Sequence, residues 1–530
     1  SAGCADLDEE IVTGVTGEFF GTPEGADAAI TGTYARLRNW YGQQRETTML
    51  MSGTDTWDKG GEAGNDAPFN DYTSALAPIM NITMLRDQWQ NLYEAVNAAN
   101  TAIKFIGEST AIPEENKSVR LGEARFLRAM FYFTLVRTWG DVHLTLEPTE
   151  GVVIEASRTP IAQIYGEAII PDLEIAIANL PLTQPQFGRA TGGAAQTLLA
   201  EVYLTRADAG DFDRAVELTT EVINSGMYAL DPSFENLFCG PTIPDACEFV
   251  PANETNPEFI FSVQFTRDGV VDLFGNTLEM YYVMAYDQQA HVKEGMPALG
   301  RTLEYGRPLR RVRPTDHLIN LFNRETDSRY EDSFQTFWRY PSGDTAIYMP
   351  GTDDIDPALQ SRPYAVWGQG EYTNVLFPTL KKWLDDKRAE PNQWGGQRDR
   401  QVWRLAEVYL MRAEANIRAG RVEAAIPDLN VIRQRAAKPG MDNELTGAEL
   451  AVLNTDPIDF LLDERERELA GEEFRFFTLT RMGRLVDRVQ RFNPNGGPNV
   501  QEHHARRPIP QEQIDRTAGG AAAFPQNAGY

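Results

Sequence analysis

The sequence predicts a mostly α-helical protein in which divergent, tetratricopeptide-like helical hairpins form a scaffold for a large, irregular, loop-rich insertion with short strands. Three observations support this fold class. The segment LAEVYLTRADA at 199–209 recurs almost unchanged as LAEVYLMRAEA at 405–415. Long amphipathic stretches flank both copies. Residues 231–400, which lie between them, are rich in Pro, Gly, Asn, Asp and aromatic residues.

Each copy of the repeat predicts one amphipathic helix. Leu199, Val202 and Tyr203 have the i, i+3, i+4 spacing of one helical face, and the second copy repeats this pattern from Leu405. The small residue that such repeats usually place against a neighbouring helix is replaced here by a bulky tyrosine. The repeats are therefore divergent.

A turn and a second amphipathic stretch follow each copy. GDFDRAVELTTEVI begins at Gly210 and GRVEAAIPDLNVI at Gly420, so that a glycine stands where the first helix should end. The second copy has four more residues before its glycine, which predicts a first helix that is one turn longer. Because one hairpin cannot bury its apolar face alone, we expect other hairpins to stack on it.

We expect the chain to form a single domain, 1–530, built from several parts. Its parts are an N-terminal helical scaffold at 26–230 that includes a loop at 42–80, an irregular part at 231–400, a C-terminal hairpin and helix at 401–490, and an extended tail at 491–530. The helical periods that supply the scaffold lie at 26–41, 89–106, 119–140, 164–180 and 460–485.

The composition excludes some classes of partner. The formal net charge is −28, from 77 acidic and 49 basic residues, so the surface would repel a nucleic-acid backbone. No uninterrupted apolar run approaches the ~20 residues of a membrane-spanning helix. We therefore expect no nucleic-acid partner and no helix that spans a bilayer.

The three cysteines have different surroundings. Cys239 and Cys247 lie in the Pro-rich segment FCGPTIPDAC, where they could form a local disulfide in an oxidising compartment or remain free thiols. A zinc site would need two more ligands at suitable spacing. Cys4 lies in SAGC, which resembles a bacterial lipoprotein processing site, although Ser1 stands where leucine is usual.

Sequence motifs for catalysis are weak. None of the five histidines forms HExxH, and neither GxSxG nor a phosphate-binding loop occurs. Carboxylate pairs such as Asp353 with Asp354, or Glu407 with Glu414, leave a glycoside hydrolase as an alternative. We interpret DERERE at 463–468 as a charged, partly exposed helix face, and the histidine pair at 503–504 as a solvated turn.

No cofactor is expected, and calcium is the only metal that the sequence leaves open. The aspartates near the start of the chain could supply hard oxygen ligands, although they lack the spacing of an EF-hand. These residues are Asp55, Asp58, Asp66 and Asp71.

Five blocks in order give the chain a resemblance to the SusD/RagB family. They are GEARFLRAMFYFTLVRTWGDVHL, NPEFIFSVQF, LAEVYLMRAEANIRAG followed by LNVIRQRA, DERERELAGEEFRFFTLTRMG, and the ending RPIPQEQID…FPQNAGY. The resemblance implies a non-enzymatic lipoprotein, anchored through Cys4 on the extracellular face of the outer membrane. It further implies a lid on a SusC-like, TonB-dependent transporter that captures oligosaccharides or, in RagB-like members, peptides.

The resemblance also places the ligand site by region, in the loop at 42–80 and in the irregular part at 231–400. Aromatic planes there could cover the apolar faces of sugar rings, while amides and charged groups bind the hydroxyls. The candidates are Trp57, Asn70, Tyr72, Tyr281, Tyr282, Tyr286, Trp338 and Trp367. Packing under a loop is the alternative for each aromatic. If they contact ligand, Trp57→Ala or Trp338→Ala should weaken binding without unfolding the protein.

Two further interpretations stay open at this point. The basic segment RPLRRVR at 307–313 is either a solvated or acid-paired strand, or forms a clamp for an anionic glycan. The helical repeats could act as a scaffold for protein partners on a face separate from the ligand site.

Overall fold

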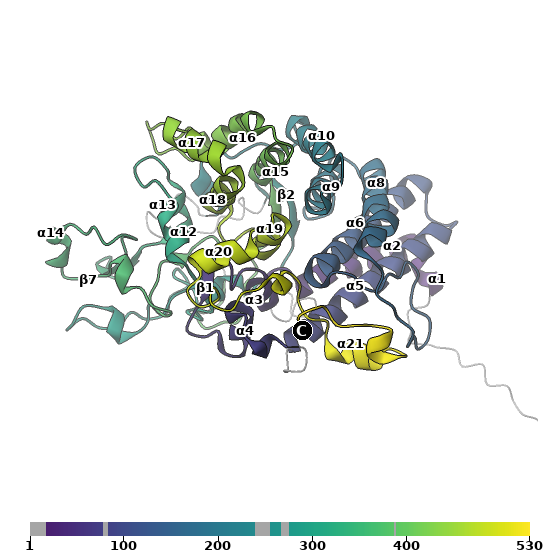
Figure 1. Ribbon diagram of the computed structural model, residues 1–530, viewed down its shortest axis with the longest axis horizontal. Helices are drawn as coiled ribbons and strands as arrows, with labels where there is room; N and C mark the ends of the chain where they lie inside the picture. Colours follow the sequence, from purple (N-terminus) through teal and green to yellow (C-terminus); the bar gives the residue numbers. More distant parts are fainter. Residues whose placement is uncertain (1–16, 78–82, 239–254, 267–274, 386–387) are drawn as a thin grey trace, which may run out of the picture.

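The structure is a computed structural model that describes residues 17–77, 83–238, 255–266, 275–385 and 388–530. In Figure 1 the long helices occupy one side of the molecule, and the short strands and loops of the insertion extend from the other. The expected mostly helical scaffold with a loop-rich insertion is confirmed. Cys4, Cys239 and Cys247 lie outside the described residues.

Long helices build the scaffold. They are α2 (Pro23–Ala35), α5 (Thr83–Glu108), α6 (Glu114–Trp139), α8 (Ile170–Asn179), α9 (Gly192–Arg206), α10 (Asp211–Asn224), α15 (Leu405–Arg418), α16 (Val422–Arg435), α17 (Gly447–Thr455) and α18 (Pro457–Leu469). Shorter helices are α1 (Gly17–Phe20), α3 (Gln44–Leu50), α4 (Ala67–Asp71), α7 (Ile161–Ile164), α11 (Leu278–Tyr282), α12 (Asp316–Asn320), α13 (Arg329–Ser333), α14 (Pro357–Gln360), α19 (Arg475–Arg481), α20 (Leu485–Phe492) and α21 (Gln511–Arg516). No helix in these ranges combines the length and the apolar character that a membrane span requires.

The helices stack in chain order, and α6 lies at the centre of the N-terminal half. α5 packs on α6, α6 on α8, α8 on α9, and α9 on α10. From Phe126 to Trp139 the side chains of α6 are buried on every face, because helices cover it from several sides. The helix ends at Gly140, whose φ of 84° an L side chain rarely adopts.

The two copies of the repeat become adjacent hairpins. α10 packs on α15, so that the pair α9 and α10 continues directly into the pair α15 and α16 (Figure 1). The expectation of a longer first helix in the second copy is wrong, since α15 has 14 residues and α9 has 15. α15 does extend further at its C-terminal end, but strand β9 occupies the residues before Leu405 and removes the N-terminal turns that α9 has.

The insertion leaves and re-enters the scaffold at one place. Strand β2 (Phe259–Val263) pairs antiparallel with β9 (Arg400–Arg404), which leads straight into α15. Between them, residues 264–266, 275–385 and 388–399 form small sheets, one of which includes a strand from the N-terminal loop. The strands are β1 (Trp57–Lys59) with β3 (Val312–Pro314), β4 (Phe334–Gln335) with β8 (Thr379–Leu380), and β5 (Phe337–Arg339), β6 (Thr345–Tyr348) and β7 (Ala365–Val366) in one three-stranded sheet.

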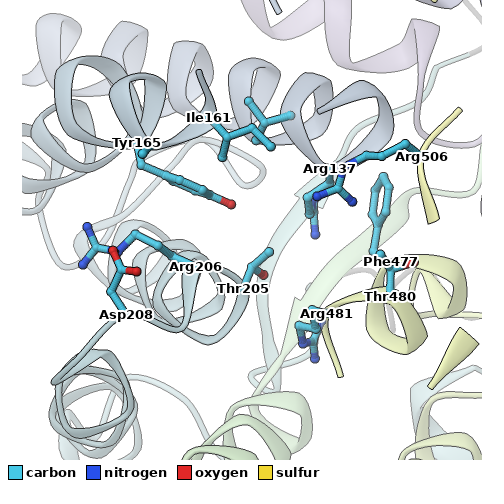
Figure 2. A pocket seen from close by; sticks show the side chains of 12 residues that line it. Arg137, Ile161, Tyr165, Thr205, Arg206, Asp208, Phe477, Thr480, Arg481 and Arg506 are labelled. Atoms are coloured by element: carbon cyan, nitrogen blue, oxygen red, sulfur yellow. The ribbon is translucent and has the colours of Figure 1, made fainter. Parts of the chain in front are cut away.

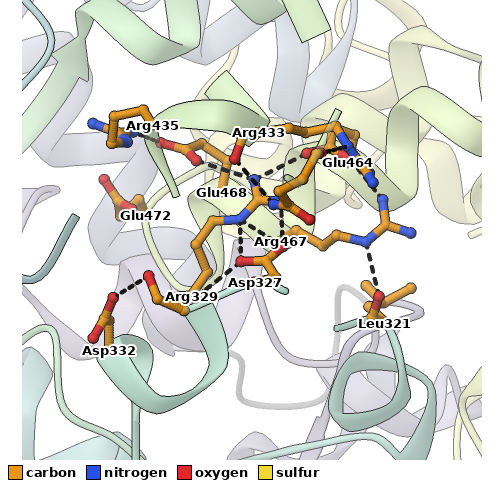
Figure 3. A network of polar contacts seen from close by, with 12 residues as sticks. Leu321, Asp327, Arg329, Asp332, Arg433, Arg435, Glu464, Arg467, Glu468 and Glu472 are labelled. Carbon is orange, nitrogen blue, oxygen red and sulfur yellow. Dashed lines mark hydrogen bonds and ion pairs between the residues drawn. The ribbon is translucent and has the colours of Figure 1, made fainter. Parts of the chain in front are cut away.

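Buried ion pairs connect the insertion to the scaffold (Figure 3). Arg329 of α13 pairs with Glu464 at 2.9 Å and Glu468 at 3.1 Å, both on α18. Arg433 of α16 pairs with the same Glu464 at 2.9 Å. The interpretation of DERERE as a partly exposed face is therefore wrong for most of its residues, because Glu464, Arg465, Glu466 and Glu468 are completely buried.

Candidate functional site

A cavity of about 760 Å³ lies where the N-terminal loop, the start of α5 and the insertion meet. Three segments of the chain contribute to its wall: the loop at 42–80, the first turn of α5, and two residues of the insertion. Its lining residues are Gln43, Gln44, Arg45, Gly64, Asn65, Asp66, Pro68, Phe69, Ala75, Thr83, Met84, Asp87, Tyr281 and Trp394. The volume lies in the usual range for small-molecule sites.

The loop that forms most of this wall is held by the basic segment at 307–313. Strand β1 pairs with β3, and arginines of that segment reach acidic residues of the loop. Arg310 pairs with Glu62 at 2.8 Å, Arg311 with Asp66 at 3.0 Å, and Arg313 with Asp58 at 2.9 Å. The segment is therefore acid-paired, which was one of the two interpretations that the sequence left open.

Trp394 is the large aromatic side chain that the cavity exposes to solvent. It is 42% exposed, and the guanidinium of Arg307 lies 5.0 Å from its ring centroid. The sequence analysis did not select it. A signal was available, because Trp394 lies in AEPNQWGGQRD, where no neighbouring apolar residue suggests a buried strand or helix.

The polar side chains of the wall are held in defined positions. Gln44 donates to the carboxylate of Asp66, and Gln43 donates to the carbonyl of Gly275 at 3.0 Å. Burial raises the pKa of Asp66, although Arg311 acts in the opposite direction. Asn65 is exposed beside them. The wall thus offers amide, carboxylate and guanidinium groups from short, well-connected elements.

This set of groups suits a polyhydroxylated ligand. An exposed indole covers the C–H face of a sugar ring, and planar amides and charged groups make directed hydrogen bonds to hydroxyls. Binding of this kind needs no proton transfer. The carboxylates of Asp66 and Asp87 each already contact a cation, Arg311 for the first and Arg86, at 2.8 Å, for the second.

Of the residues predicted for the site, the structure brings Tyr281 to the cavity. It is only 1% exposed and its ring lies 5.8 Å from the guanidinium of Arg311. Trp57 packs edge-on against Tyr282 with ring centroids 4.9 Å apart, and both rings are buried. These two side chains are enclosed by protein, so that a ligand could reach them only after the surrounding segments moved.

Asn70 and Tyr72 belong to the same loop but point into the protein. Asn70 donates to Asp58 at 3.0 Å, and the hydroxyl of Tyr72 donates to the carbonyl of Gly53 at 2.7 Å. Both are buried. These two side chains therefore support the backbone of the loop, and the choice of this region as the ligand site stays a prediction.

The remaining predicted aromatics belong to the core of the insertion. Tyr286 donates to the carbonyl of Gly306 at 2.7 Å, and Trp338 is fully buried in β5. Trp367 is half-buried and donates to the carbonyl of His291 at 2.9 Å. None of the three lines the 760 Å³ cavity. Their burial supports the packing alternative, and ligand contact by Trp367 stays a prediction.

The four aspartates considered for calcium are each engaged by a cation. Asp55 binds Arg475 and Arg488, and Asp58, Asp66 and Asp71 bind Arg313, Arg311 and Lys59 respectively. Within the described part of the chain, no three His, Cys, Asp or Glu side chains converge as metal ligands.

Of the two carboxylate pairs considered for catalysis, Asp353 and Asp354 are exposed, whereas Glu407 and Glu414 are buried in the scaffold. Glu414 pairs with Arg481 at 2.8 Å, and cations including Arg481 lower its pKa to about 2 in spite of burial. Glu407, on the same helix, has a pKa raised to about 7 by burial. The histidine pair is also not simply solvated, because His504 is buried and burial lowers its pKa to about 3.

A stack of helical hairpins that carries a loop-built cavity with an exposed tryptophan defines a class of scaffolded small-molecule binding proteins. Comparison with known families makes this more specific. Residues 257–530 match the SusD family, and residues 37–204 match a family described as starch-binding, associating with outer membrane. The chain belongs to the SusD family.

Individual relatives agree with this assignment. The chain is 28% identical to SusD-like protein P2 of Formosa agariphila, over all of this chain and 97% of the relative. It is 24% identical to the starch-binding protein SusD of Bacteroides thetaiotaomicron, over 80% of this chain and 75% of the relative. The fold is similar to that of surface glycan-binding protein A from Bacteroides thetaiotaomicron in complex with laminarihexaose, with a TM-score of 0.69 and 18% identity, over 96% of this chain and 99% of that one.

Proposed function

We propose that this protein captures oligosaccharides in the 760 Å³ cavity and delivers them to a SusC-like, TonB-dependent transporter, for which it acts as a lid. The observation that carries the carbohydrate assignment is the exposed ring of Trp394 at the edge of a cavity lined by amides and charged groups. Two related proteins have names that refer to starch and to glycan binding, which supports the same ligand class.

The proposed location is the extracellular face of the outer membrane, with a lipid on Cys4 as the anchor. The match of residues 37–204 to a family described as associating with the outer membrane supports this location. A lipid anchor requires no membrane-spanning helix, and none is present in the described ranges. We propose a binding role without catalysis, since the related proteins carry the names of binding proteins.

The first test is native affinity electrophoresis of protein that lacks Cys4, through gels that contain starch, laminarin and a series of other neutral and acidic polysaccharides. Retardation by a polysaccharide, followed by calorimetric titration with its oligosaccharides and no release of reducing ends, is the expected result. Release of reducing ends would identify a hydrolase. Unchanged mobility on every gel, together with binding of peptides, would favour the RagB-like alternative.

The lid role needs a separate experiment. Full-length protein isolated from detergent-solubilised outer membranes should co-purify with a TonB-dependent transporter. Recovery of the lipidated protein without such a transporter would contradict the proposed delivery step while leaving the binding assignment intact.

A further inference from the structure

A second cavity, of about 430 Å³, lies within the helical scaffold and shares no lining residue with the first. It forms where the C-terminal ends of α6 and α9 meet α7, α19 and the segment after residue 505. Four arginines line this space, and one of them, Arg206, extends toward Asp208, which also lines it (Figure 2). The four are Arg137, Arg206, Arg481 and Arg506. A protein with a net charge of −28 has gathered cations here.

Three of these arginines have structural partners. Arg206 pairs with Asp211 and Arg481 with Glu414, and Arg137 pairs with Glu201. Arg137 and Arg206 also lie in the last turns of α6 and α9, where a cation complements the helix dipole. The structure of the scaffold alone accounts for these three charges.

Arg506 is different, because no carboxylate of the described residues lies within ion-pair distance of its guanidinium. Its guanidinium donates to the carbonyl of Ala505 at 3.1 Å, and the carboxylate of Asp141 acts on it only at longer range. It is half-buried, and burial lowers its pKa. The nearby carboxylate of Asp141 instead accepts the backbone N–H of Ile161 at 2.9 Å. A half-buried cation without a close ion-pair partner is costly, and an incoming anion would reduce that cost.

The backbone around the cavity is irregular at two places. Tyr165 begins a π-helical turn, Tyr165–Ile169, between α7 and α8, and such turns occur frequently at functional sites. Ala207, which ends α9 beside Arg206, has a φ of 56°, an unfavourable value for a residue with a side chain. Both irregularities position residues that line the cavity.

The π-helical turn directs the phenol of Tyr165 into the cavity (Figure 2). The ring is 5% exposed, and burial raises the pKa of the hydroxyl to about 12. The hydroxyl is therefore protonated at neutral pH and can donate a hydrogen bond. Phe477 and Ile161 provide an apolar wall beside it.

We propose that this cavity is a second ligand site, which binds a small organic anion through its carboxylate, phosphate or sulfate group. Arg506 and the hydroxyl of Tyr165 bind the oxyanion, and Phe477 contacts the body of the ligand. The volume fits a ligand of about one sugar ring at the lower end of the range for small-molecule sites. The proposal does not depend on the carbohydrate assignment of the first cavity.

The test is calorimetric titration of the whole protein with D-glucuronate and with inorganic phosphate, at matched ionic strength, with D-glucose as the neutral control. We expect an anionic probe to bind and glucose to leave this site empty. Binding of both anions would identify the oxyanion as sufficient. Binding of glucuronate alone would show that the body of an acidic sugar contributes.

Variants assign the binding to this cavity. Arg506→Gln should lower the affinity for the anionic probe about tenfold, because a charge-assisted hydrogen bond is lost. Tyr165→Phe, which removes one hydroxyl and keeps the ring, should weaken binding of the anion several-fold. It is the variant to use if Arg506→Gln lowers the melting temperature of the protein. Trp394→Ala, in the 760 Å³ cavity, should not change the affinity for the anion. Absence of binding by both anions at about 10 mM, or unchanged binding in both cavity variants, would overturn the proposal.

Discussion

Replacement of Trp394 by alanine is the sharpest perturbation of the proposed glycan site. The side chain is 42% exposed, which corresponds to about 100 Å² of a tryptophan surface of about 250 Å². A sugar ring on one face would cover about half of that area. At about 25 cal/mol per Å² the lost contact is about 1 kcal/mol, so the affinity for a bound oligosaccharide should fall about tenfold or slightly less.

The same substitution should leave stability almost unchanged, because an exposed side chain contributes little to the core. The assay is calorimetric titration of wild type and Trp394→Ala with the oligosaccharide that the gel experiment identifies, together with thermal melting of both proteins. Phe187→Ala is the matched control, since Phe187 is 38% exposed and does not line the cavity. Its affinity should equal that of wild type.

Trp338→Ala provides the contrasting case. Trp338 is fully buried, so its truncation should cost about 3–5 kcal/mol of unfolding free energy. The sequence predicts weaker ligand binding without loss of stability for this variant, and the structure reverses that expectation. The reasoning is refuted if Trp394→Ala binds the glycan as tightly as wild type, or if Trp394→Ala and Trp338→Ala destabilise the protein equally.

Three further predictions concern the scaffold. Tyr203→Ala, in α9, should lower the unfolding free energy by about 3 kcal/mol without changing glycan affinity, as measured by denaturant unfolding and titration. Arg404→Ala should cost about 3–5 kcal/mol, since it leaves two or more buried glutamates without this cation, and a loss below 1 kcal/mol would contradict the assigned ion pairs. The unfolding free energy should be highest near pH 5. The pKa of Glu407 is raised to about 7, so the folded state binds a proton more tightly than the unfolded state, and stability rises as pH falls toward 5. The pKa of Glu414 is lowered to about 2, so stability is lost as pH falls further and this carboxylate becomes protonated. Denaturant midpoints between pH 2 and 8 test the resulting maximum, and a monotonic rise with pH would exclude it.

The helical scaffold could be predicted because its signals are local. The spacing of Leu199, Val202 and Tyr203 depends on a few consecutive residues, and the long helical periods became helices, although the period at 460–485 is divided between α18 and α19. The length of α15 was predicted wrongly for a nonlocal reason. Strand β9 precedes Leu405 because it pairs with β2, more than a hundred residues away in the chain.

The side chains of the site were harder to predict, because an aromatic residue in a loop has two possible fates. Trp338 and Trp394 lie in the same insertion, yet one is fully buried and the other is 42% exposed. Local sequence separates them only weakly, since Trp338 lies among strand-forming residues and Trp394 among polar ones. The burial of Glu464 could not be predicted either, because its partners Arg329 and Arg433 come from distant segments.

The two walls of the proposed glycan cavity are supported differently, and this difference affects which of them can change to alter ligand choice. The N-terminal wall is fixed to the scaffold, because Asp55 binds Arg475 of α19 and Arg488 of α20 through buried contacts of 2.7 Å and 2.6 Å. Trp394 instead lies on the connection between β8 and β9, outside any helix or strand. That connection contains the buried ion pairs of Lys382 and Arg388, but residues 389–394 are not buried and make no ion pair with the described residues. Substitutions at 389–394 can therefore move the ring proposed to cover a sugar without breaking a buried ion pair. Ligand choice could therefore vary there while the wall formed by residues 43–75 and 83–87 stays in place.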